Sequence, residues 1–237
     1  MKPHKLSTIL LTCSLVFLEC AASYAKQPSH SVRTSILDNP YVVLAEDPKE
    51  KSLYGYVAAL RTAPDRTDEC KFFFKGEPFR NGISRLLIAD TTIYRSPSAT
   101  QSRGLAHGVI KNVDDKHVLE ISDADRLGNC DWILGFIGEP SVSQKGKNFK
   151  ISVNGEENGD WNSLAVICNK KAHFFSEPNE QKKRKAFVVA GDLIYVYEQT
   201  ADWYYAKYSY GRSETVGWIK KVDTIQIQGG KIAPGCN

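Results

Sequence analysis

The sequence lacks the long apolar runs that cross membranes. Its longest apolar run, residues 6–18, has about 13 residues, whereas a transmembrane helix needs roughly 20. No later segment is long and apolar enough to span a bilayer. We therefore predict that the chain is not an integral membrane protein.

The sequence also lacks the short motifs that mark common enzymes. It contains neither H-E-x-x-H nor G-x-S-x-G, and His107, His117 and His173 lie in no recognised catalytic motif. Cell-wall peptidases of the cysteine class need a free cysteine followed by a histidine, and the cysteines here are expected to be paired. Carboxylate pairs that cleave sugars leave no short trace in a sequence, so a hydrolase stays an alternative. We predict a protein that is not an enzyme and needs no cofactor.

Net charge is low as well. The chain carries a formal charge of +4 over 237 residues, which is too little to indicate nucleic acid as a partner. Positive charge is concentrated in one run, Lys182-Lys183-Arg184-Lys185, which we predict to be a solvated loop. The alternative is attraction to an acidic partner or an anionic wall polymer. No aromatic residue interrupts this run, which further disfavours nucleic-acid binding.

Cysteines are few and widely spaced. Four of the six lie after position 25, namely Cys70, Cys130, Cys168 and Cys236. An even number in an exported protein favours two disulfides, for which three connectivities exist. We favour pairing within each half, Cys70–Cys130 and Cys168–Cys236. No two of these cysteines stand two to four residues apart, as structural zinc sites require, so we predict no metal site.

The N-terminus has the features of a signal peptide. Lys2 and Lys5 precede the apolar run, and Ser23 and Ala25 fit the small-x-small rule for cleavage. We therefore expect cleavage near Ala25 and a periplasmic or secreted protein. A membrane anchor and a lipoprotein modified at Cys20 are the alternatives, disfavoured by the short apolar run and by the glutamate that precedes Cys20.

The rest of the chain has the pattern of an all-β protein. Short apolar runs are separated by Gly, Asn and Pro, and no stretch keeps an apolar period of 3.6 residues. We predict a leader over residues 26–50, with a short strand at 41–44, and a β-rich domain of no recognised family over residues 51–160. The polar segment 154–162 is predicted to be the junction with a second domain.

The C-terminal third contains five spaced elements in a characteristic order. They are residues 172–178 (AHFFSEP), 186–192 (AFVVAGD), 194–197 (IYVY), 203–208 (WYYAKY) and 217–220 (GWIK). This order resembles the bacterial SH3-like domain, and the resemblance covers about residues 168–228. It implies a small β-barrel over residues 165–230, followed by a tail at 231–237. The resemblance further implies recognition of cell-wall peptide or glycan, as in many relatives.

Alternation in two of these strands predicts which side chains share a face. Ile194 and Val196 face one side and Tyr195 and Tyr197 the other. In the next strand, one face takes Tyr204, Ala206 and Tyr208, and the opposite face takes Trp203, Tyr205 and Lys207. A small barrel buries one face of a strand, so we expect several rings at the surface, where Tyr and Trp anchor ligands well. The predicted ligand-binding residues are Tyr195, Tyr197, Trp203, Tyr205 and Trp218.

The sequence therefore favours an exported, non-catalytic binding protein of the cell envelope. Its partner would be wall peptide or glycan. An inhibitor or immunity protein that binds an envelope-acting enzyme is the first alternative, because a rigid, disulfide-stapled β protein loses little entropy on binding. A cell-wall hydrolase with an unrecognised catalytic half is the second.

Overall fold

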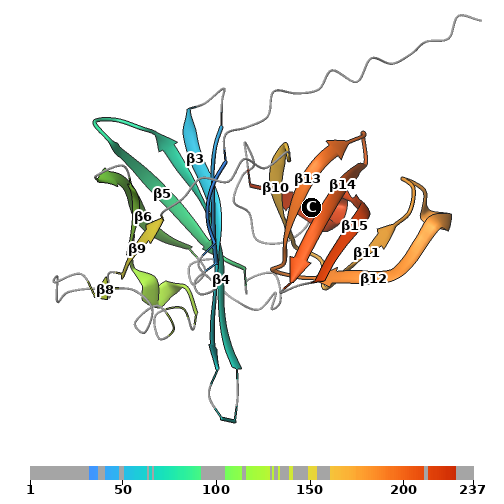
Figure 1. Ribbon diagram of the computed structural model, residues 1–237, viewed down its shortest axis with the longest axis horizontal. Coiled ribbons are helices and arrows are strands. Elements are labelled where there is room, and N and C mark those ends of the chain that lie inside the picture. The colour runs from blue at the N-terminus through green and yellow to red at the C-terminus, as the bar shows by residue number, and fades with distance from the viewer. Residues whose placement is uncertain are drawn as a thin grey trace, which may run out of the picture.

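The structure, a computed structural model, describes most of the chain from residue 32 to residue 227. The described residues are 32–36, 41–47, 51–62, 64–65, 67–91, 105–113, 116–128, 130, 133, 139–140, 149–153, 161–210 and 213–227. The predicted signal peptide, Cys236 and the predicted tail lie outside them. The protein is all-β, with two curled antiparallel sheets side by side (Figure 1). The described residues include no helix long and apolar enough to cross a membrane.

The first sheet has nine strands in the order β1-β2-β3-β4-β5-β6-β7-β9-β8. Their bounds are β1 Val32–Ile36, β2 Tyr41–Glu46, β3 Ser52–Thr62, β4 Thr67–Pro78, β5 Ile83–Asp90, β6 Leu105–Val113, β7 Lys116–Ser122, β8 Glu139–Pro140 and β9 Phe149–Val153. Neighbours in sequence are mostly neighbours in the sheet, because short turns join antiparallel strands. Alternate side chains of β5 are buried and exposed until Ile88, as expected for a sheet with one covered face.

The predicted leader over residues 26–50 is part of the first sheet. The short strand predicted at 41–44 within it is confirmed as β2, whereas β1 was not predicted. This segment contains β1 and β2, and β2 lies between β1 and β3 in the first sheet. The β2 side chains from Val42 to Ala45 are almost completely buried. The prolines and polar residues around this strand gave the segment a loop-like composition. Its short apolar run nevertheless packs into the core between neighbouring strands. Strand β6 was also not predicted, since His107 and Gly108 interrupt its apolar pattern.

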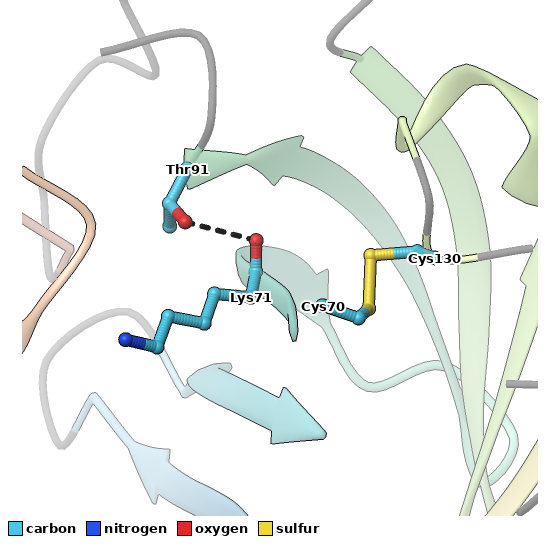
Figure 2. Close-up of a disulfide and its surroundings, with 4 residues drawn as sticks. All are labelled: Cys70, Lys71, Thr91 and Cys130. Atoms are coloured by element: carbon cyan, nitrogen blue, oxygen red, sulfur yellow. Dashed lines mark hydrogen bonds between the residues drawn. A yellow bond between two sulfur atoms is a disulfide. The ribbon is translucent and has the colours of Figure 1, made fainter. Parts of the chain in front are cut away.

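The core of the first sheet surrounds a disulfide. Cys70 of β4 is bonded to Cys130, 60 positions later in the sequence, with Cα atoms 4.8 Å apart, which confirms that predicted pair. Both cysteines lie in the same buried apolar cluster as Phe72 and Phe74. Next to Cys70, the carbonyl of Lys71 accepts a 3.0 Å hydrogen bond from Thr91 Oγ1, while the Lys71 side chain extends away from the disulfide (Figure 2).

The second sheet has seven strands in the order β12-β11-β15-β14-β13-β10-β16. Their bounds are β10 Ser163–Ile167, β11 Lys171–Phe175, β12 Lys183–Val189, β13 Leu193–Gln199, β14 Trp203–Tyr210, β15 Ser213–Lys220 and β16 Thr224–Gln226. A turn at Gly191-Asp192 joins β12 to β13. Gly191 has φ of 92°, a conformation that L side chains rarely adopt, and Asp192 N donates to Val189 O at 3.0 Å.

The basic run is a strand for most of its length, which corrects the predicted loop. Lys183, Arg184 and Lys185 begin β12, which lies at an edge of the second sheet. All three side chains are exposed. Three consecutive charged residues fit a strand here because an edge strand has solvent beside it as well as over its outer face.

The two sheets share a buried cluster and form one packed unit. The first sheet contributes Tyr54, Tyr56 and Phe73, and the second contributes residues such as Val166 and Tyr195. Tyr56 donates a 3.0 Å hydrogen bond from its hydroxyl to Gly191 O across the contact. In Figure 1, β3 and β4 form the side of the first sheet that faces the second. We call this the inter-sheet cluster.

Trp161, from the predicted junction, also lies in the inter-sheet cluster. It is 4 % exposed, and its ring lies 5.6 Å from that of Tyr195, centroid to centroid. Residues 154–160 lie outside the described residues. At its C-terminal end, at least, the junction is part of the packing between the sheets and not a solvated linker.

Candidate functional site

Strands β11, β15 and β14 present one continuous outer face. In the sheet, Trp218 of β15 lies opposite both Phe175 of β11 and Tyr205 of β14, and Trp203 lies opposite Lys220. Residues paired in this way have side chains on the same face. Along β14, Tyr204 and Ala206 are buried in the core of the second sheet, whereas the residues that alternate with them are half-buried. The predicted division of β14 between its two faces is therefore confirmed.

Four rings gather on this outer face. Phe175 and Trp203 meet edge to face with centroids 4.8 Å apart, and Tyr205 and Trp218 lie 5.4 Å apart. Phe175 is almost completely buried, while the other three rings are half-buried. We call these four residues the aromatic face. Its three half-buried rings are among the predicted ligand-binding residues.

Sequence reasoning missed Phe175. It stands in the first SH3-like element, where Phe174 and Phe175 are adjacent and point to opposite faces of β11. Phe174 fills the core, and Phe175 supports Trp203. Its pairing with Trp218 depends on β11 lying beside β15. The alternation of residues 171–175 was the available signal, but it does not reveal that neighbour.

A groove of about 540 Å³ lies at one end of the aromatic face. It is lined by Pro178, Asn179, Glu180, Asp202, Trp203, Lys220, Lys221 and Val222. These residues come from three places in the second sheet: the β11–β12 connection, the start of β14 and the end of β15 with the turn after it. Only Trp203 of these was predicted as a binding residue.

Local hydrogen bonds position the groove residues. Asn179 precedes the short 3-10 helix Glu180–Lys182 and accepts a 2.9 Å bond from Gln181 N, which fixes the start of the turn that carries Glu180. Trp203 is held at the β13–β14 turn by Thr200: its carbonyl accepts a 2.9 Å bond from Thr200 N, and its N–H donates a 3.2 Å bond to Thr200 Oγ1. Lys221 N donates to Asp202 O at 2.8 Å, joining the other two walls.

An ion pair spans the groove beside the tryptophan. Lys220 Nζ lies 2.5 Å from Glu180 Oε1 and 5.7 Å from the centroid of the Trp203 ring. The hydrogen bond from Lys220, reinforced by its charge, lowers the pKa of Glu180 below its ordinary value. The groove therefore offers a ring face, a cation and the carboxylates of Glu180 and Asp202. These groups can hold an apolar ring or sugar face together with polar groups of either charge.

Tyr195 was predicted to bind ligand. The structure corrects this prediction, because Tyr195 lies in the inter-sheet cluster and is only 8 % exposed. It does share the outer face of the sheet, because it lies opposite Lys207. The prediction assumed that the outer face of β13 meets solvent. In the structure, the first sheet covers that part of the face and leaves only the β14, β15 and β11 part open.

Tyr197 lies at the margin between the covered and open parts. It is half-buried and packs against the inter-sheet cluster. Burial disfavours the charged form of Lys207, but the charge and hydrogen bond of Tyr197, with those of Glu214, outweigh it and raise the pKa of Lys207. Tyr197 therefore acts mainly as a packing and hydrogen-bonding residue rather than as part of the aromatic face.

The described residues hold no group of three or more potential metal ligands. Cys168 is disulfide-bonded, and its predicted partner Cys236 lies outside the described residues. The three histidines considered for catalysis lie on different strands, and the ring of His173 contacts Phe187 and the Arg184 carbonyl. Comparison of the chain with protein-family models, curated proteins and solved structures found no match.

Proposed function

We propose that this chain is an exported, non-catalytic binding protein of the cell envelope. Its C-terminal half is an SH3-like domain, and its ligand is cell-wall peptide or glycan. The groove and the three half-buried rings of the aromatic face form the binding site. The observation that carries the proposal is the position of Trp203, whose ring borders the groove and is backed by Phe175.

The chemistry of the groove suits wall polymers. Sugars stack on indole faces, and stem peptides carry carboxylate and amine groups. Lys220 and Lys221 supply positive charge, and Glu180 and Asp202 supply negative charge, within one groove. A carboxylate of the ligand would replace Glu180 as the ion-pair partner of Lys220. This replacement costs little free energy, because the Glu180 side chain is 74 % exposed and its ion pair is weak.

Export agrees with the disulfide chemistry. The Cys70–Cys130 pair and the bonded state of Cys168 suit an oxidising compartment. The signal peptide with cleavage near Ala25 remains our prediction from the sequence. Both features are consistent with a periplasmic or secreted location.

The inhibitor alternative is supported by a different observation. The two sheets are joined by a buried cluster and by contacts such as Tyr56 with Gly191, so the molecule can present both halves as one rigid surface. Pre-organisation of this kind lowers the entropy cost of binding a folded enzyme. The wall-binding proposal uses only the groove of the second sheet, and this difference separates the two functions experimentally.

The test is co-sedimentation of residues 26–237 with purified peptidoglycan sacculi at low and high salt. We expect the protein to pellet with the sacculi at both salt concentrations. Trp203→Ala or Tyr205→Ala should lower the affinity for sacculi by about tenfold, since a buried aromatic contact is worth roughly 1–2 kcal/mol. Phe187→Ala is the matched control, because it removes an exposed ring of the same sheet outside the groove. Each variant is checked by thermal unfolding.

Three outcomes contradict the proposal. Absence of pelleting would reject wall binding and direct the search to an envelope enzyme captured by the intact chain. Pelleting that vanishes with salt would reduce it to electrostatic association. Equal loss in Phe187→Ala and Trp203→Ala would show that the groove is not the site.

A further inference from the structure

Strand β12 is an exposed edge of the second sheet. It has seven residues, and β11 is its only strand partner in the part of the chain that the structure describes. Its other side therefore presents backbone N–H and C=O groups to solvent. Such an edge is a template for pairing with another extended chain.

An exposed aromatic ring is fixed beside this edge. Phe187 is 48 % exposed, and it lies opposite His173 on β11. The His173 ring is 5.8 Å from the Phe187 ring, and Lys171 Nζ lies 3.9 Å above the same ring. The ring is thus held in place from its own sheet while nearly half of its surface stays open. It can receive an apolar side chain from an incoming strand.

The segment that carries the ring is positively charged. Residues 170–189 hold six lysine and arginine side chains and two glutamates, a net +4 that equals the net charge of the whole chain. Both glutamates are engaged, Glu177 with Lys182 at 3.6 Å and Glu180 with Lys220 at 2.5 Å. Lys183 and Lys185 form no ion pair with any described residue, and both are exposed.

Protection against aggregation explains only part of this arrangement. Lysines on an edge strand commonly discourage pairing with other copies of the chain, and they do so here by repulsion. That role does not require an exposed phenylalanine, which works against it. The lysines repel another copy of this strand, and the exposed Phe187 ring offers an apolar contact. Together these features favour an incoming strand of negative charge.

We propose that β12 binds an extended acidic segment of a partner protein, which adds to the second sheet as a further strand. Carboxylates of the segment meet Lys183 and Lys185, and an apolar side chain contacts Phe187. This surface is separate from the groove, so it can be tested whether or not the groove binds the cell wall. A second copy of this chain is disfavoured as the occupant by the charge of the edge itself.

The probe is a fluorescein-labelled peptide in which glutamate and valine alternate over about eight residues, matching the length of the strand. A second peptide keeps the glutamates but replaces central valines with proline, which cannot continue a hydrogen-bonded ladder. A third has lysine in place of glutamate. Anisotropy with the intact mature chain should detect binding of the first peptide, at least about tenfold weaker binding of the second and none of the third.

Variants then locate the site. Lys183→Glu/Lys185→Glu should weaken the first peptide by about tenfold or more, and Phe187→Ser by about fivefold. Arg80→Glu/Arg85→Glu, an equal charge change at exposed positions of the first sheet, should leave binding unchanged. Amide hydrogen exchange in β12 should slow on binding. Absence of binding, equal binding of the proline peptide, or equal loss in the first-sheet control would overturn the proposal.

Discussion

The ammonium group of Lys71 lies 3.2 Å from Asp192 Oδ1 and joins the two sheets. Lys71 belongs to β4, and Asp192 belongs to the turn before β13, 121 positions later. Both side chains are largely buried, with 13 % and 6 % exposed, and Asp192 Oδ2 also accepts a 3.0 Å bond from Val189 N. The pair therefore fixes the β12–β13 turn and the contact between sheets together.

Removing the Asp192 carboxylate should destabilise the whole protein. Asp192→Ala leaves the mostly buried ammonium of Lys71 with Glu69 as its ion-pair partner among the described residues, and it removes the acceptor of Val189 N. We therefore expect a loss of about 2–4 kcal/mol in the free energy of unfolding. Urea unfolding measures it. Lys111→Ala is the control, because Lys111 and Glu120 are much more exposed, and it should cost under about 1 kcal/mol. Similar costs for the two variants would contradict the role of burial.

The two halves should unfold together. Trp161→Ala removes a large side chain from the inter-sheet cluster, and we expect about 3–5 kcal/mol of destabilisation. Tyr56→Phe, which removes only the hydroxyl that bonds Gly191, should cost about 1 kcal/mol. Circular dichroism and tryptophan fluorescence should give coincident urea transitions in both variants. Two separate transitions in the unmodified protein would mean that the halves are independent.

The Cys70–Cys130 bond should be a major source of stability. It closes a loop of 60 positions, for which the chain-entropy model gives about 4 kcal/mol. Cys70→Ala/Cys130→Ala should therefore lower the urea midpoint strongly while leaving the far-ultraviolet spectrum native-like. Thiol titration of the unfolded, unreduced protein supplies the check on pairing, since reactive thiols from these cysteines would contradict the bond.

Gly55 should tolerate no side chain. A Cβ there would lie 2.2 Å from Val43 O on the neighbouring strand and 2.6 Å from the Phe74 ring. Gly55→Ala must displace β2 or Phe74, at a cost of about 1–3 kcal/mol or more. Gly82, which has open space around its Cβ position and φ of 74°, is the comparison. Gly82→Ala should cost only about 1 kcal/mol, from backbone strain.

Glu180 should titrate below its usual range because of Lys220. The pKa of Glu180 is lower in the folded protein than in the unfolded chain. The stabilisation from its contact with Lys220 is therefore fully present above the pKa of the unfolded chain, and it is lost as pH falls through the pKa of the folded protein. Carboxyl NMR titration should show this pKa returning upward in Lys220→Gln. Lys221→Gln is the control and should leave it in place, because Lys221 bonds Gln199 instead.

A large part of the secondary structure followed from local pattern. The strands around residues 41–44 and 194–197 were predicted, because alternation and turn residues act over a few neighbouring positions. The same locality left residues 26–50 outside the predicted β-rich domain and made the basic run at the start of β12 a predicted loop. Composition alone does not reveal that an apolar run among prolines is sheltered by β1 and β3, or that a basic run occupies an edge.

The candidate site was likewise predicted in part from local sequence patterns and in part could not be. Alternation by itself determined that Trp203 and Tyr205 share a face opposite Tyr204, and the cysteine count and spacing led to the Cys70–Cys130 pair. Only the tertiary structure decided which part of that face is open, because the first sheet covers Tyr195 and leaves Trp203 half-buried beside the groove. It also decided that Phe175, Glu180 and Lys220 meet Trp203. Contacts between strands distant in sequence depend on sheet order, which no local pattern encodes.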